Sequence, residues 1–217
     1  MQQPIQINYK STNRPHIAIQ WLRELPDLFS ADFECAVKYT ESDITQFKKE
    51  LENEPTKYRA IELKSKLSAT ALSHPSHTCL THFSAASSES DGFVLVLDNE
   101  RIAQVLLSFL VTTTKTQIWH NASFDFKHIH YYTGRMPLNY EDTQIRAKCL
   151  INHVDTWKAN TGLKQLAGHI YGDWGISSDN FTVSQMHEDH VIKYACIDAC
   201  ATYWLYNAIS RKVLCAT

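Results

Sequence analysis

The sequence is poor in the features that mark several classes of protein. Glycine and proline number only six each among 217 residues, which excludes collagen-like and low-complexity chains. The longest apolar stretch, residues 102–111, contains two polar residues and is too short to span a bilayer. The first ten residues are polar and lack the apolar core of a signal peptide. We therefore expect no contact with a membrane and a cytoplasmic location.

Cysteine pairs and positive charge are also scarce. The six cysteines form no Cys-x-x-Cys pair and no regular framework, so we expect free thiols in a reducing compartment. The 21 basic residues are outnumbered by 23 acidic ones, and the formal net charge is −2. This balance excludes a protein that binds nucleic acid through bulk positive charge. A nuclease is still allowed, because bound metal ions supply local positive charge.

The sequence does contain short apolar runs that alternate with helical patterns, which is typical of an α/β domain. We expect residues 1–14 to be a polar arm and residues 15–217 to form a single domain. A helical insertion is predicted at about 41–72, where Pro55 starts the second of two helices. Strands are expected at residues 28–37, 79–84, 93–97, 117–120 and 140–143, and helices at 16–25, 102–111, 123–132, 144–153, 161–171 and 187–209. The predicted fold class is therefore α/β, with a mixed five-stranded sheet flanked by helices.

Two acidic residues stand out in the first of these strands. Asp32 and Glu34 are two positions apart, so both side chains point to one face of a strand that is otherwise mostly apolar. Two carboxylates about 4 Å apart repel by about 4 kcal/mol at an effective dielectric constant of ~20. A shared proton, a basic residue or a divalent cation could offset this cost, and no basic residue lies in the strand itself. The alternative is an acid pair that lies at a strand edge or is solvated. A second Asp-x-Glu, at residues 98–100, precedes a predicted helix and fits a capping role instead.

Two more acids occupy informative positions later in the chain. Asn121 and Asp125 lie where a short strand runs into a helix, a place that also suits a capping asparagine and an acid near a helix N-terminus. Tyr194 and Asp198 are four residues apart and share one face of the last helix. The neighbours of Asp198 are small or apolar, so we expect this helix to be buried. A buried carboxylate is costly and requires a ligand.

In this order, Asp-x-Glu, Asn-x-x-x-Asp and Tyr-x-x-x-Asp resemble the three motifs of the DEDDy 3′–5′ exonucleases. The chain is similar within that group to the proofreading domain of family A DNA polymerases, particularly the phage type. The supporting segments are Glu141-Asp142-Thr143, Gly162-Leu163-Lys164-Gln165-Leu166-Ala167 and VIKYACIDACATYWLY at residues 191–206. The resemblance covers about residues 28–209. It departs from the family in the long helical stretch after Glu34 and in the lack of a polymerase region within this sequence.

The resemblance implies a ribonuclease H-like (DnaQ-like) fold that binds two Mg²⁺ or Mn²⁺ ions. It assigns Asp32, Glu34 and Asp198 to one ion, and Asp32 together with Asp125 to the other. Tyr194 would act in catalysis by orienting the attacking water, because a phenol with an ordinary pKa of about 10 is a poor base at neutral pH.

Two further residues of the second motif are candidates for binding the substrate. Asn121 would contact the terminal nucleotide, with helix capping as its alternative role. Phe124 matches an aromatic position of the family motif, and packing against the core explains it equally well.

The implied reaction is two-metal hydrolysis that releases nucleoside 5′-monophosphates from the 3′ end of single-stranded DNA, as in proofreading. The implied partners are that 3′ end and a DNA polymerase in cis or in trans, in a bacterial or phage-infected cell. Two alternatives stay open: ribonuclease D-like trimming of RNA 3′ ends, and a non-catalytic module that binds a polymerase or single-stranded DNA. The presence of all four acids and the tyrosine argues against the non-catalytic module.

Overall fold

The computed structural model describes residues 4–38, 41–56, 74–151, 161–172, 174 and 187–211. In this part of the chain, a six-stranded sheet has the strand order β1-β4-β3-β2-β5-β6. The strands are β1 (Asn8–Thr12), β2 (Leu28–Val37), β3 (Thr78–Ala86), β4 (Asp91–Val96), β5 (Thr116–Trp119) and β6 (Tyr140–Asp142). Strand β3 is antiparallel to both of its neighbours and all other pairs are parallel, so the sheet is mixed.

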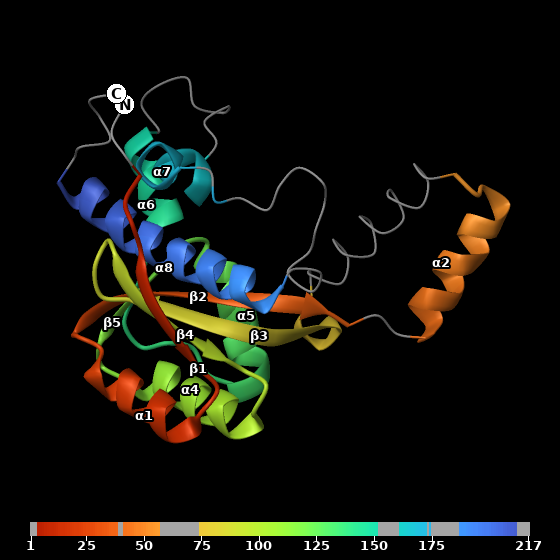
Figure 1. The fold of residues 1–217 in the computed structure, drawn as a ribbon, viewed down its shortest axis with the longest axis horizontal. Coiled ribbons are helices and arrows are strands. Elements are labelled where there is room, and N and C mark those ends of the chain that lie inside the picture. Colours follow the sequence, from red (N-terminus) through yellow and green to blue (C-terminus); the bar gives the residue numbers. More distant parts are fainter. Residues whose placement is uncertain are drawn as a thin grey trace.

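Helices cover both faces of this sheet (Figure 1). One face packs against α1 (Pro15–Glu24), α4 (Glu100–Thr112) and α5 (Ala122–Thr133), and the other carries α6 (Thr143–Ile151), α7 (Leu163–Tyr171) and α8 (Glu188–Ser210). Strand β2 lies between β3 and β5 and is buried on both faces, as its apolar residues predict. No helix among the described residues is long and apolar enough to cross a membrane.

The middle of helix α8 packs closely on the sheet through small residues. Its buried residues there include Ala195, Cys196, Ala199, Cys200 and Ala201. Across from it, Gly92 of β4 leaves no room for a side chain, since a Cβ atom there would lie 2.8 Å from the Cys196 Sγ. The buried Ser30 hydroxyl of β2 donates a 2.7 Å hydrogen bond to the Ala199 carbonyl oxygen. These contacts hold the middle of α8 against β4 and β2.

The α/β class and the mixed sheet are confirmed, but the predicted number of five strands is wrong. Residues Asn8–Thr12, expected within a polar arm, form β1 and pair in parallel with β4. Four of the five β1 side chains are exposed, so the strand has no apolar alternation that a sequence pattern could reveal. Backbone pairing, helped by the 3.1 Å hydrogen bond from Asn8 Nδ2 to Asp91 Oδ1, holds it in place.

The predicted insertion at about 41–72 is described only in its first half. Helix α2 (Glu41–Asn53) is the first of the two expected helices, and it lies apart from the sheet in Figure 1. The second expected helix, after Pro55, falls on residues 57–73, which lie outside the described residues.

Candidate active site

Strand β2 supplies two of the predicted acidic residues from the centre of the sheet. Asp32 is half-buried and Glu34 is 8% exposed. Both line one cavity of about 330 Å³, as expected for residues two positions apart on a strand. The pairing of β2 with β3 shifts register between Glu34 and Cys35, and such a bulge changes the direction of nearby side chains. The strand therefore presents both carboxylates to a shared space, which rules out an exposed pair at a sheet edge.

Helix α8 brings the third carboxylate to the same place. Asp198 is 7% exposed, and one oxygen from each of Asp32, Glu34 and Asp198 lies within 4.8 Å of the other two. Tyr194 lies one turn earlier on α8 and lines the same cavity. Three carboxylate oxygens at this separation match the donor set of a hard divalent cation such as Mg²⁺. The residues present therefore fit the metal site that the sequence predicted.

Asp125 approaches the cavity from the first turn of α5. It is 2% exposed, and its Oδ1 accepts a 3.3 Å hydrogen bond from the backbone N–H of Phe33, between the two acids of β2. It lines the cavity but lies outside the three-carboxylate cluster. Its predicted role, in which it holds a second ion together with Asp32, stays a prediction.

The electrostatics of the cluster are unfavourable in the absence of a cation. Burial raises the pKa of Asp32 and of Glu34 well above their ordinary values, and repulsion from the neighbouring carboxylates raises each pKa further. Burial also raises the pKa of Asp125, to about 8. A divalent cation would favour the ionised form of all these groups, so metal binding would release protons.

Asp198 has two neighbours that the sequence interpretation did not assign to the site. The indole Nε1 of Trp174 donates a 2.6 Å hydrogen bond to Asp198 Oδ1, and Lys164 Nζ lies 3.5 Å from Asp198 Oδ2. Burial raises the pKa of Asp198, while the Lys164 charge and the Trp174 hydrogen bond oppose that rise. Lys164 belongs to the segment Gly162–Ala167 that supported the family resemblance, so a signal for it was present. No sequence signal marked Trp174 apart from its aromatic side chain.

Lys164 also contacts the predicted catalytic tyrosine. Its Nζ donates a 2.5 Å hydrogen bond to the Tyr194 hydroxyl and lies 4.4 Å from the centroid of the Tyr194 ring. Burial, and then the negative charge of Asp198, raise the pKa of Tyr194 above its ordinary value. The hydroxyl is therefore protonated at neutral pH, which supports orientation of a water molecule over its deprotonation.

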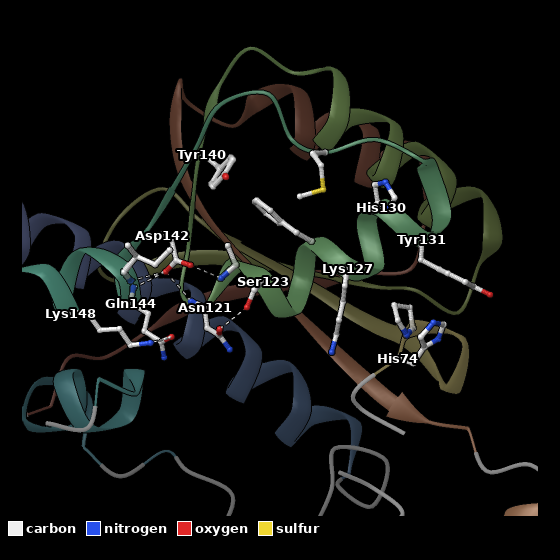
Figure 2. A pocket seen from close by; sticks show the side chains of 15 residues that line it. His74, Asn121, Ser123, Lys127, His130, Tyr131, Tyr140, Asp142, Gln144 and Lys148 are labelled. Carbon is white, nitrogen blue, oxygen red and sulfur yellow. Dashed lines mark hydrogen bonds between the residues drawn. The ribbon is translucent and has the colours of Figure 1, made fainter. Parts of the chain in front are cut away.

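The alternative prediction, that the Asn121 side chain caps helix α5, is wrong. Asn121 is the N-cap of α5 but makes no side-chain cap, and its backbone is left-handed (φ 62°, ψ 49°). The cap comes instead from Asp142 at the end of β6, whose oxygens accept hydrogen bonds from the backbone N–H groups of Asn121 and Ala122 at 3.2 and 2.9 Å (Figure 2). Asparagine tolerates the left-handed conformation better than most residues, which explains its presence here. The Asn121 side chain points outward and lines the cavity.

Asp142 caps a second helix with the same carboxylate. Its Oδ1 also accepts hydrogen bonds from the backbone N–H groups of Gln144 and Ile145, at 2.8 and 3.2 Å, in the first turn of α6. One buried side chain thereby joins the N-termini of α5 and α6 beside the cavity.

Phe124 also lines the cavity, in a half-buried position. Its ring centroid lies 5.3 Å from that of His128, and Lys127 Nζ lies 4.4 Å from the Phe124 ring. The ring thus packs within α5 on one side and faces the cavity on the other. Contact of Asn121 and Phe124 with a terminal nucleotide stays a prediction.

Comparison with known proteins was informative only at the level of structure. No family model matches the sequence, and no curated protein is significantly similar to it. The fold resembles Brucella melitensis NrnC bound to pGG (TM-score 0.57, 14% identity, covering 98% of this chain and 83% of that chain) and the same protein with bound Mg²⁺ (TM-score 0.54). It also resembles the catalytic core of RRP6 from Trypanosoma brucei (TM-score 0.62, 12% identity, 99% and 50% coverage) and Escherichia coli RNase D, an exoribonuclease involved in structured RNA processing (TM-score 0.53, 15% identity, 96% and 45% coverage).

These similarities establish the fold of the chain. Its sheet and flanking helices match the ribonuclease H-like architecture of DnaQ-type exonucleases, which confirms the predicted fold class. At such low identity the likeness extends to the fold alone. The resemblance to a phage-type proofreading domain stays a prediction.

Proposed function

We propose that this chain is a metal-dependent 3′–5′ exonuclease that releases nucleoside 5′-monophosphates from single-stranded nucleic acid. The observation that carries the proposal is the convergence of acids from β2, α5 and α8 on one cavity. Three of them, Asp32, Glu34 and Asp198, place oxygens within 4.8 Å of one another. These elements belong to a fold shared with proteins described as a nuclease and an exoribonuclease.

Each residue of the site would have its own role in hydrolysis. Divalent cations bound there would activate water and stabilise the leaving oxygen of the phosphodiester. Asp32, Glu34 and Asp198 would hold one cation, and Asp125 would share Asp32 in holding a second. The neutral Tyr194 hydroxyl would orient the water, and Lys164 would keep that hydroxyl in place through their hydrogen bond.

For the chemical nature of the strand, we propose single-stranded DNA as the substrate, because the motifs resemble a proofreading domain. RNA is a second candidate of equal standing, since one protein of similar fold is an exoribonuclease and another is bound to pGG. A DNA polymerase acting in cis or in trans is proposed as a partner on the same sequence resemblance.

Degradation of end-labelled oligonucleotides tests the proposal directly. A 5′-labelled DNA strand and an RNA strand of the same sequence are incubated with Mg²⁺, with Mn²⁺ and with EDTA. We expect a ladder that shortens from the 3′ end only when a metal ion is present, with nucleoside 5′-monophosphates as products. The ratio of the two rates identifies the preferred sugar.

A matched variant excludes contaminating nucleases. Asp198→Asn protein prepared in the same way should leave both strands intact, because it removes one of the three clustered carboxylates. Cleavage that persists in EDTA, or intact DNA and RNA with both metals, would refute the proposed metal-dependent exonuclease activity.

A further inference from the structure

A second and larger cavity, of about 790 Å³, adjoins the candidate active site (Figure 2). It is a groove between α5, β6 and the start of α6. Asn121 and Gln144 line both the groove and the acidic cavity, so the two cavities adjoin at these residues. The groove is open to solvent, and nothing in the proposed hydrolysis uses it.

Several of the exposed large apolar side chains among the described residues gather in the walls of the groove. Among the described residues, seven large apolar side chains are prominently exposed, and four of the seven line this groove. These four are Tyr131, Met136, Tyr140 and Ile145. Tyr131 and Tyr140 are 51% and 50% exposed, so about half of each residue is accessible to a ligand. Such a concentration of exposed apolar side chains marks a binding surface.

Positive charge accompanies these rings. Lys127 and Lys148 line the groove, and Lys148 Nζ donates a 3.0 Å hydrogen bond to Gln144 Oε1 on the shared wall. The groove's one acidic lining residue is Asp142, whose carboxylate already accepts four backbone hydrogen bonds. Two lysines against one carboxylate give the groove lining a net positive charge in a chain of net charge −2, which locally favours an anion.

We propose that this groove binds the part of the single strand that precedes the 3′-terminal nucleotide. Exposed aromatic rings that stack on bases, next to lysines that pair with phosphates, are the general means of holding single-stranded nucleic acid. A strand whose last phosphodiester lies at the acidic cluster must leave that cavity, and Asn121 and Gln144 form its boundary with the groove. The proposal rests on the proposed exonuclease and assigns to it a preference for strands longer than a dinucleotide.

Substrate length separates the groove from the active site in an experiment. We compare kcat/KM on a ten-nucleotide strand and on a dinucleotide, with the preferred sugar, for the wild type and for the double variant Tyr131→Ala/Lys148→Ala. The matched control is Tyr9→Ala/Lys10→Ala on β1, where Tyr9 is 46% exposed. Neither pair of residues belongs to the acidic cavity.

We expect the groove variant to lose about tenfold or more on the long strand, since stacking on one ring and one phosphate contact are both removed. Its kcat/KM on the dinucleotide should equal that of the wild type, and the control should match the wild type on both substrates. The dependence of long-strand affinity on salt should also become shallower by about one unit of slope.

Equal losses on both substrates would overturn the proposal, because they would indicate a disturbed active site. An unchanged preference for the long strand would also overturn it, and would leave the groove to another occupant such as a protein partner. If the wild type cleaves nothing, the proposed exonuclease activity is refuted. Fluorescence anisotropy of a labelled ten-nucleotide strand then tests separately whether the groove binds the strand. Weaker binding by the groove variant than by the control would support it, and equal binding would overturn it.

Discussion

Two sets of buried carboxylates lie close together in this molecule, and they differ in what satisfies them. Asp142, at the end of β6, accepts four backbone N–H groups and joins the N-termini of α5 and α6. In the cluster of Asp32, Glu34 and Asp198, hydrogen bonds from Trp174 and Tyr194 and the charge of Lys164 all act on Asp198. The comparison distinguishes an acid whose partners are backbone N–H groups from acids whose oxygens match the donor set of a divalent cation.

The two sets should therefore respond to mutation in opposite ways. Removing a carboxylate from the cluster relieves repulsion but abolishes the metal site. Removing Asp142 leaves four backbone donors without their partner while the metal ligands stay in place. Activity and stability then report separately on the two sets.

The largest effect is expected for Asp32→Asn, because Asp32 is assigned to both metal ions. Hydrolysis should fall at least about a thousandfold, which corresponds to about 4 kcal/mol of transition-state stabilisation. In EDTA, however, the variant should be more stable than the wild type, since neither the burial of an ionisable carboxyl group nor its repulsion by neighbouring acids then opposes folding. Cleavage rates and urea unfolding measure the two quantities.

The control for this variant is Asp98→Asn, in the second Asp-x-Glu of the sequence. Asp98 is exposed and accepts a 3.2 Å hydrogen bond from Asn13 Nδ2, far from any metal ligand in the sequence. Its change should leave activity unaltered. Wild-type cleavage by Asp32→Asn would remove that residue from the site.

Asp142→Ala should have the next largest effect, on stability. We expect a loss of about 2–3 kcal/mol, because helix caps on α5 and α6 disappear and buried donors lose their partner. Asp142→Asn should lose less, since one side-chain oxygen remains. Urea unfolding measures these losses, with Glu141→Ala as the neighbouring control, whose partly exposed ion pair with Arg146 contributes little to stability. Equal stability of Asp142→Ala and wild type would contradict the double-cap interpretation.

Tyr194→Phe should slow hydrolysis by about tenfold to a hundredfold without loss of metal binding. The change removes the hydroxyl that would orient water and also the acceptor of the Lys164 hydrogen bond. Single-turnover rates measure the first effect, and the stabilisation produced by Mg²⁺ in thermal unfolding measures the second. A wild-type rate would exclude Tyr194 from the mechanism, and loss of the Mg²⁺ stabilisation would assign it to metal binding instead.

The smallest effect concerns the stability of the metal-free protein at different pH. The pKa of Asp125 is raised to about 8 in the folded protein, so the folded state holds a proton that the unfolded state has released. The free energy of unfolding should therefore fall as pH rises from 6.5 to 8, with a slope approaching about 1.4 kcal/mol per pH unit for one such group. Buried histidines with lowered pKa act below this range, because histidine ordinarily titrates near 6.5.

The variant Asp125→Asn isolates this contribution. Its amide oxygen can still accept the hydrogen bond from the Phe33 N–H, so the fold is preserved. In EDTA its stability should decline less than that of the wild type between pH 6.5 and 8, as followed by urea unfolding. A steeper decline in the variant would reverse the sign and contradict the raised pKa.

Sequence patterns predicted the buried elements of the fold and the acids of the cavity. Strand β2 and helix α8 carry strong periodic or continuous apolar signals, so Asp32, Glu34 and Asp198 could be placed on them. Strand β1 was missed because its pairing is made by the backbone, which leaves no trace in side-chain pattern. The same limit applies to the register shift between Glu34 and Cys35.

The remaining site features depend on contacts between residues far apart in sequence. Lys164 reaches Tyr194 across 30 positions, and Trp174 reaches Asp198 across 24. Local spacing predicted Asn121 as the residue whose side chain caps α5. Asp142 caps the helix instead, because the parallel pairing of β6 with β5 brings its carboxylate to the start of α5. Local pattern identifies which residues are chemically able to act, and tertiary structure decides which of them do.

Helix α8 packs closely on the sheet where Gly92 faces Cys196. Asp32 and Glu34 come from β2 and Asp198 from α8, so the distance between this helix and the sheet affects the separation of the three carboxylates. One added methyl group at Gly92 would lie 2.8 Å from the Cys196 sulfur of α8 and 2.9 Å from the Ala85 carbonyl oxygen of β3, so the helix or the strands would have to shift. Under the proposed function, a larger residue at this contact would therefore alter the spacing of the carboxylates even where the protein stays folded.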